Sequence, residues 1–289
     1  MSPQHVNLLR GPARLLDMDQ ETPNPQPPHP QEPPATPAAV RVVTQLQVGD
    51  IFRWLRAGAR DWVAHPWIAG FYGLCFWAMA LALGWMFRAS PEYVMSLASG
   101  CLLVGPFMAM GLYEASRRHA CGERLRLQDS LWCWKPHLPS MGTLALVLLV
   151  LELLWGRASL VVFAVFFQTG LPSTASVMQA ILSPDNLEFV LAYMLVGSVF
   201  AACVYAMSVV SIPLILDRGT DAITAGITSL EVVLQNPLVM ALWGVFITLT
   251  VALALLLPWS VGLVVLGPWL GHASWHAYRG AVQWSDPLP

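Results

Sequence analysis

Six long runs of apolar residues divide most of the chain into segments of membrane-spanning length. A helix needs about 20 apolar residues to cross the roughly 30 Å hydrocarbon core of a bilayer. The pattern therefore predicts an all-α membrane protein with six transmembrane helices arranged as three hairpins. The predicted spans cover residues 67–87, 94–116, 141–167, 188–216, 238–257 and 259–279.

Part of this pattern occurs twice. "WVAHPWIAGFYG" (62–73) is matched 171 residues later by "VLQNPLVMALWG" (233–244), and "GPFMAMGLYEASR" (105–117) is matched 162 residues later by "GPWLGHASWHAYR" (267–279). Each unit is predicted to contain a cytoplasmic amphipathic surface helix, a proline that begins a span, and a returning span. An even number of spans gives every copy the same orientation, so we expect parallel internal repeats. A weaker third copy begins at "LRLQDSLWCWKPHLPSM".

Lysine and arginine are distributed unevenly about the predicted spans. Thirteen of the 15 lie on the side of the two termini, Arg88 lies on the other side, and Arg157 lies within a span. Positive residues concentrate in cytoplasmic loops. Both termini are therefore predicted to be cytoplasmic, which places a multi-pass protein in the bacterial inner membrane.

Composition distinguishes an N-terminal region from the apolar remainder of the chain. The chain is 56% hydrophobic and only 11% charged, against about 25% charged residues in soluble domains. Residues 1–39 differ, because ten prolines lie between Pro3 and Pro37. They are predicted to form a disordered Pro-rich cytoplasmic tail, with a polyproline ligand as the alternative, and residues 40–289 form the membrane domain. The net charge of −2 favours no nucleic-acid partner.

The segment before the first span is strongly amphipathic. In "DIFRWLRAGARDWV", Arg53, Arg56 and Arg60 share one face, and apolar residues such as Ile51 and Leu55 occupy another. Such a helix is typical of the headgroup layer. Two interpretations stay open: lipid-headgroup contact that senses anionic lipids, or an anchor that sets the depth of the first span.

Four sequence motifs within these units resemble those of a known family. "WLRAGARDWVAHPWIAGFYGLCF", "LLVGPFMAMGLYEASRRHACGE", "IPLILDRGTDAITAGITSL" and "LGPWLGHASWHAYR" are similar to bacterial integral membrane proteins grouped as domain of unknown function 2189. The resemblance runs from about residue 40 to the end. It implies an inner-membrane protein, and oxidase-like names among relatives imply that a redox role needs testing.

Histidines are the weak candidates for a metal site. His272 and His276 are spaced i, i+4, so both rings share a helix face and could hold one metal. A haem-copper core would also need histidines near mid-membrane on several helices. The alternative is that interfacial histidines cap backbone groups. We predict no metal and no cofactor.

Glu152 and Arg157 each lie within the third predicted span. A charged side chain at this depth carries a free-energy cost of insertion into the hydrocarbon, so these two residues need an explanation. Five residues of helix place them about 140° apart, too far round to pair directly. We expect Arg157 to face the protein interior and find an acceptor on another helix. The two residues form either a polar pocket for a charged headgroup or ion, or a buried structural network.

Glu114 and His276 occupy equivalent positions in the two clear units and are candidates to line a shared ligand-binding vestibule; the alternative is ordinary helix-end polarity. Nucleotide, dinucleotide, zincin and nucleophile-elbow motifs are missing from the sequence. The favoured function is non-enzymatic: binding of a lipid or another membrane protein, as a scaffold or assembly factor. The alternatives are a small transporter or channel with a polar site near Glu152 and Arg157, and third, a haem or metal redox protein.

Overall fold

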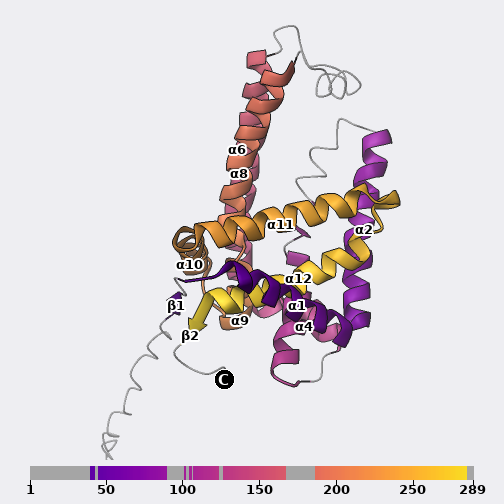
Figure 1. Ribbon diagram of the computed structural model, residues 1–289, viewed down its shortest axis with the longest axis vertical. Helices are drawn as coiled ribbons and strands as arrows, with labels where there is room; N and C mark the ends of the chain where they lie inside the picture. The colour runs from indigo at the N-terminus through magenta and orange to yellow at the C-terminus, as the bar shows by residue number, and fades with distance from the viewer. Residues whose placement is uncertain are drawn as a thin grey trace, which may run out of the picture. The chain divides into compact units, whose positions relative to one another are not determined.

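The structure of the protein is a computed structural model (Figure 1). The chain divides into two units, residues 1–38 and 39–289, and every described residue belongs to the second. The predicted disordered tail and polyproline segment therefore lie outside the described residues. The structure describes residues 40–42, 45–89, 101, 104–105, 107–123, 126–166 and 186–284.

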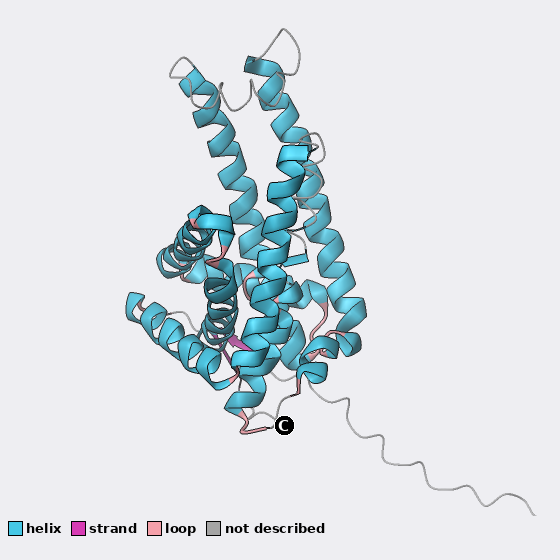
Figure 2. Cartoon of the chain, turned by 90° about the vertical axis from the view of Figure 1, so that its right-hand side faces the viewer, coloured by secondary structure: helices cyan, strands magenta, loops and turns pink. Residues whose placement is uncertain are grey.

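Helices dominate the described part of the chain (Figure 2). The first half contains α1 (Val48–Ala64), α2 (Pro66–Ala89), α4 (Met110–Ala120), α5 (Leu127–Trp132), the 3₁₀ turn η2 (Lys135–His137) and α6 (Leu138–Phe166). The second half contains α8 (Leu187–Ser208), α9 (Ser211–Arg218), α10 (Ala222–Gln235), α11 (Pro237–Leu256), the 3₁₀ turn η4 (Pro258–Ser260) and α12 (Leu263–Ala281). A short antiparallel ribbon, β1 (Val40–Val42) with β2 (Val282–Trp284), was not predicted, since three-residue strands show no clear pattern.

Among the described residues, four segments are long and apolar enough to cross a membrane, which confirms the predicted helical class. They are Pro66–Met86, Leu127–Phe166, Leu187–Arg218 and Pro237–Leu256, and they correspond to predicted spans one, three, four and five. Most of the outer half of predicted span two lies outside the described residues. Predicted span six is a helix, α12, but it is not among the four.

α12 differs from the spans because other helices cover it. It packs against α1, α2 and α4, and His272, Trp275 and Tyr278 on it are almost completely buried. Glycines allow the close approach. A Cβ on Gly58 of α1 would lie 2.6 Å from the Ala273 nitrogen, and a Cβ on Gly73 of α2 would lie 2.1 Å from the Val264 carbonyl oxygen. Small residues at helix crossings have this role in membrane bundles.

α6 and α8 form a separate hairpin-like pair, drawn side by side in Figure 1. Aromatic rings fill the contact: Trp155 lies 5.2 Å from Tyr193, and Phe163 lies 4.9 Å from Phe189, between ring centroids. Much of the remaining α6 surface is apolar and exposed, as expected for a helix that faces lipid on several sides.

The two repeated helix corners have the same local geometry. His65 ends α1 with φ −127° and ψ 58°, and Asn236 ends α10 with φ −127° and ψ 52°. A proline begins the next helix in each case, where its missing N–H removes no helical hydrogen bond. The helix starts differ, because Asp50 is the third residue of α1, whereas the aligned Asp221 is the N-cap of α10.

The wider repeat is not shown. In Figure 1, α11 runs across the direction of α2 rather than along it. The start of α5 does resemble the start of α1: both have an N-cap residue at φ −105° and an aspartate at the third position that accepts from the N-cap backbone. Local agreement at these corners is therefore stronger than agreement in the arrangement of whole helices.

Candidate functional site

A cavity of about 470 Å³ lies where α2, α4, α5 and the start of α6 meet. This volume is within the range of about 300–1,000 Å³ typical of small-molecule pockets. Aromatic, aliphatic and thioether side chains make up most of its wall, among them Phe71, Phe107, Met108, Met110, Leu131 and Met141. We refer to it as the α4–α6 cavity.

The hydroxyl groups in the cavity wall are already paired with protein atoms. Tyr72 Oη and Ser130 Oγ are 3.0 Å apart, and Ser130 Oγ donates to the Gly111 carbonyl oxygen at 2.8 Å. Because these groups satisfy one another, the wall presents mainly apolar surface to an occupant. The geometry suits a hydrocarbon chain better than a polar molecule.

A cation lies beside the same cavity. Trp134 and Leu138 belong to its wall, and Lys135 is next to Trp134 in sequence. The Lys135 ammonium lies 3.7 Å from the centroid of the Trp132 ring, a cation–π contact that holds the charge near this part of the chain. A positive charge and two indoles beside an apolar cavity are typical of the membrane–water boundary.

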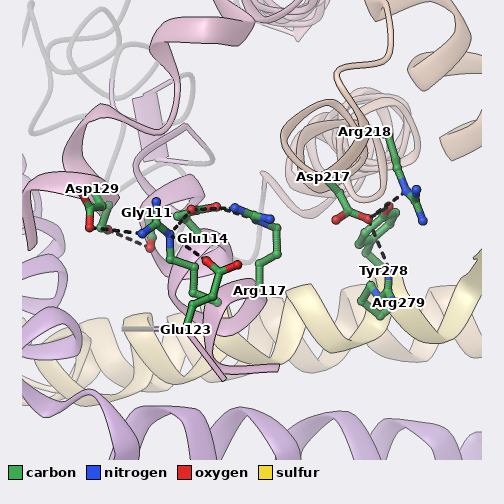
Figure 3. Close-up of polar contacts among 11 residues, drawn as sticks. Gly111, Glu114, Arg117, Glu123, Asp129, Asp217, Arg218, Tyr278 and Arg279 are labelled. Atoms are coloured by element: carbon green, nitrogen blue, oxygen red, sulfur yellow. Dashed lines mark hydrogen bonds and ion pairs between the residues drawn. The ribbon is translucent and has the colours of Figure 1, made fainter. Parts of the chain in front are cut away.

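Glu114 is buried near the cavity and is held by two arginines (Figure 3). Arg117 binds both of its carboxylate oxygens, at 2.8 and 2.9 Å. Arg118 donates to Glu114 at 2.6 Å and to Asp129 at 3.2 Å, so it links α4 to α5. Glu114 is therefore one part of an ion-pair network between α4 and α5, and none of its members lines the cavity.

Asp217, at the end of α9, is the centre of a second network (Figure 3). Its side chain is fully buried, and one carboxylate oxygen accepts from Tyr278 Oη at 2.7 Å and from Arg279 at 3.4 Å. Arg218 lies 3.7 Å from the same oxygen. These contacts join the end of α9 to the end of α12.

Asp61 is the centre of a third network and binds two helices at once. His119 of α4 lies 2.7 Å from one carboxylate oxygen, and His276 of α12 lies 2.8 Å from the other. Burial alone would raise the pKa of Asp61, but hydrogen bonds from the two histidines and a serine outweigh burial and lower it to about 2. Asp61 therefore stays a carboxylate and holds α1, α4 and α12 together.

Sequence reasoning missed Asp61 and Asp217, although a signal for Asp61 exists. The buried residues of α1 are Asp50 in the first turn, followed by Ile51, Trp54, Gly58 and Asp61. An acid on the otherwise apolar face of an amphipathic helix indicates a buried polar partner. No comparable pattern distinguishes Asp217, whose partners lie about 60 residues away.

The structure separates the two candidate metal-binding histidines. His276 faces Asp61, whereas the Nδ1 atom of His272 lies 2.8 Å from Ser116 Oγ. Within the described ranges, no three His, Cys, Asp or Glu side chains are grouped so that they could hold a metal ion. Glu114 and His276 likewise belong to different networks, and no described hydrogen bond or ion pair joins them.

The two charged residues of α6 lie outside the α4–α6 cavity. Glu152 is half-buried and has an interaction within the protein, whereas the Arg157 side chain is exposed. The expectation that Arg157 faces the protein interior is therefore wrong. The expected interior position assumed a bundle around α6, but α6 is packed mainly against α8 and leaves most of its surface open.

The basic face of α1 is exposed as predicted, and Arg53, Arg56 and Arg60 all lie on it. The opposite face does not rest in lipid. It packs against α12, with Trp54 and Gly58 at the contact. The amphipathic pattern of α1 therefore reflects helix packing within the protein.

Comparison with known proteins agrees with the predicted class. A family model described as predicted integral membrane protein (DUF2189) matches residues 93–217, a narrower range than the resemblance from residue 40 onward. No curated protein and no solved structure matches the chain significantly. The family description and the four apolar helices together identify a multi-pass integral membrane protein. Residues 93–217 of the chain are therefore similar to the DUF2189 family of predicted integral membrane proteins.

Proposed function

We propose that this is a non-enzymatic lipid-binding protein of the bacterial inner membrane, which holds an acyl chain in the α4–α6 cavity. The observation that carries the proposal is the apolar wall of this cavity, whose hydroxyl groups are paired with each other. Water in such a space would find few free partners, whereas an acyl chain would gain apolar contact along its length. Binding of this kind suits a scaffold or assembly factor better than a catalyst.

The preferred lipid carries an anionic headgroup. Lys135 lies beside the cavity wall, and its ammonium is held over Trp132. A phosphate near Lys135 would gain a charge-assisted contact while the acyl chain remains in the cavity. A transporter acting through Glu152 and Arg157 is less well supported, because neither residue lines this cavity.

The topology is part of the same proposal. Six spans, parallel repeats and cytoplasmic termini are supported by the thirteen-to-one charge distribution and by the matching corners at His65 and Asn236. In that arrangement Lys135 lies on the cytoplasmic side. The lipid would then come from the inner leaflet.

Filling the cavity tests the proposal. Gly142 lines it, and a Cβ added there meets no atom within 4 Å, so Gly142→Leu should fold and occupy the space. Gly156→Leu is the matched control: Gly156 is on the same helix, also has open space, and is not in the cavity wall. Native mass spectrometry of the purified proteins would measure the bound lipid.

We expect Gly142→Leu to lose most of the co-purifying phospholipid, with an unchanged melting temperature, while Gly156→Leu retains it. Equal lipid in all three proteins would refute acyl-chain binding at this cavity. Loss of lipid from both variants would also count against it, because the effect would then belong to α6 as a whole.

A further inference from the structure

α10 has three distinct faces along its 14 residues. Small residues including Ala225, Gly226 and Ser229 are buried against neighbouring helices, and Ser229 Oγ donates to the Ala206 carbonyl oxygen at 2.6 Å. The other two faces are exposed. One is aliphatic, and it consists of Ile223, Ile227, Leu230 and Leu234. The other is polar, and it consists of Thr224, Glu231 and Gln235.

The two exposed faces lie side by side around the helix. At 100° per residue, the aliphatic face is a stripe about 60° wide, and the polar face is centred roughly 90° away from it. Glu231 and Gln235 are hydrogen-bonded to each other at 2.7 Å, so the polar stripe has its own pairing. A helix with adjacent apolar and polar stripes is suited to the boundary between hydrocarbon and water.

α10 is too short to cross the bilayer. Its 14 residues rise about 21 Å, against the roughly 30 Å of the hydrocarbon core. Asp221 caps its first turn by accepting from the backbone nitrogens of Ile223 and Thr224, and Pro237 starts a new helix directly after it. The helix is therefore a separate element with two defined ends.

The helix that follows α10 in the chain is a candidate membrane span. α11 also exposes an apolar stripe along its length, formed by Leu238, Leu242, Val245, Leu249 and Leu253. This second stripe belongs to one of the four helices long and apolar enough to cross a membrane. The two stripes are neighbours in the chain, with exposed Leu234 and Leu238 on either side of the corner, which favours lipid rather than water as the medium around the α10 stripe.

The equivalent helix of the first repeat gives an informative contrast. With the offset of 171 residues, Ile223 and Leu234 align with Phe52 and Val63, and Ile227 aligns with Arg56. The aligned positions are exposed on α1 as well, and Arg53 and Arg60 there align with Thr224 and Glu231 of the polar stripe. Of the four stripe positions, only that of Ile227 is basic in α1, where it is Arg56; the aligned Phe52, Ala59 and Val63 are apolar.

We propose that α10 lies in the plane of the membrane, with its aliphatic stripe immersed in the outer part of the lipid hydrocarbon and its Glu231 stripe in water. On α1, Arg56 occupies the position of Ile227, and its guanidinium faces the aqueous side. The occupant of the α10 surface is the bilayer itself. This inference is independent of the α4–α6 cavity.

Site-directed fluorescence quenching would test it. The five native cysteines are replaced, and a small fluorophore is attached to one new cysteine in the full-length protein reconstituted into phosphatidylcholine–phosphatidylglycerol vesicles. The sites are Ile227 and Leu234 on the stripe, with Glu231 on the same helix and Arg56 on α1 as matched controls. Doxyl-labelled lipids report contact with hydrocarbon, and iodide reports contact with water.

We expect several-fold stronger lipid quenching at Ile227 and Leu234 than at the two controls, and the reverse order for iodide. Iodide quenching at Ile227 equal to that at Glu231 would overturn the proposal by placing the stripe in water. Protection of Ile227 from both quenchers would also overturn it, because a protein partner or a second copy would then cover the stripe.

Discussion

Single buried acids hold helices together in this protein, and they do so in different ways. Glu114 is bound mainly by arginines of its own helix, whereas Asp61 and Asp217 bind residues of distant segments. Glu152 and Arg157 stand out in the sequence because apolar residues surround them. Asp61 lies among polar neighbours, so hydropathy does not single it out; its place on the apolar face of α1 is the only sequence signal of its burial.

Replacement of Asp61 by asparagine should destabilise the fold. The variant keeps the shape of the side chain but removes the charge that two histidines bind, and we expect a loss of about 2–4 kcal/mol. Thermal unfolding in detergent would measure it. Asp221→Asn is the control, because asparagine caps a helix as well as aspartate does, and its melting temperature should be unchanged.

The wild type and Asp61→Asn can also be compared as a function of pH. The pKa of Asp61 falls from 3.8 to about 2 on folding, so the folded state keeps a charge that the unfolded chain neutralises. Its stabilising contribution is complete above pH 3.8 and is lost as the pH falls through about 2. Between these values the melting temperature of the wild type should fall more steeply than that of Asp61→Asn. If the melting temperatures of the two proteins fell in parallel with pH, the lowered pKa of Asp61 would be contradicted.

At the scale of helices, sequence patterns predicted the apolar elements well and their surroundings poorly. α2, α6, α8 and α11 lie close to the predicted spans. α1 was expected at the lipid surface, but its apolar face contacts α12. Amphipathic periodicity shows that one face is apolar; it does not show whether lipid or another helix covers that face.

The crossing of α1 and α12 should depend on Gly58. A methyl group there would lie 2.6–2.9 Å from atoms of Ala273, two of them backbone atoms that cannot rotate away. We expect Gly58→Ala to cost about 1–3 kcal/mol, measured as a lower melting temperature. Gly49→Ala on the same helix has open space and should be neutral or slightly stabilising. Equal effects would show that the close contact is not important.

At the scale of the whole molecule, charge asymmetry gives a testable topology. Single cysteines placed at Ser2 and Leu288, in a background without native cysteines, should react with a membrane-impermeant maleimide only after cells are permeabilised. Arg88→Cys, in the last turn of α2 and on the opposite side of the membrane in this topology, should react in intact cells and serves as the control. Labelling of Ser2 or Leu288 in intact cells would contradict the cytoplasmic placement of the termini.

The sequence by itself determined the helical class, the positions of four membrane-length apolar helices, and the helix breaks at His65-Pro66 and Asn236-Pro237. Hydropathy and proline chemistry act within a few turns of the chain, so a linear pattern reveals them. Only the tertiary structure decided that α12 is enclosed, that Asp61 binds a histidine 215 residues away, and that four helices surround an apolar cavity. Those features depend on which distant surfaces meet, because burial and pairing are properties of the packed chain rather than of any one segment.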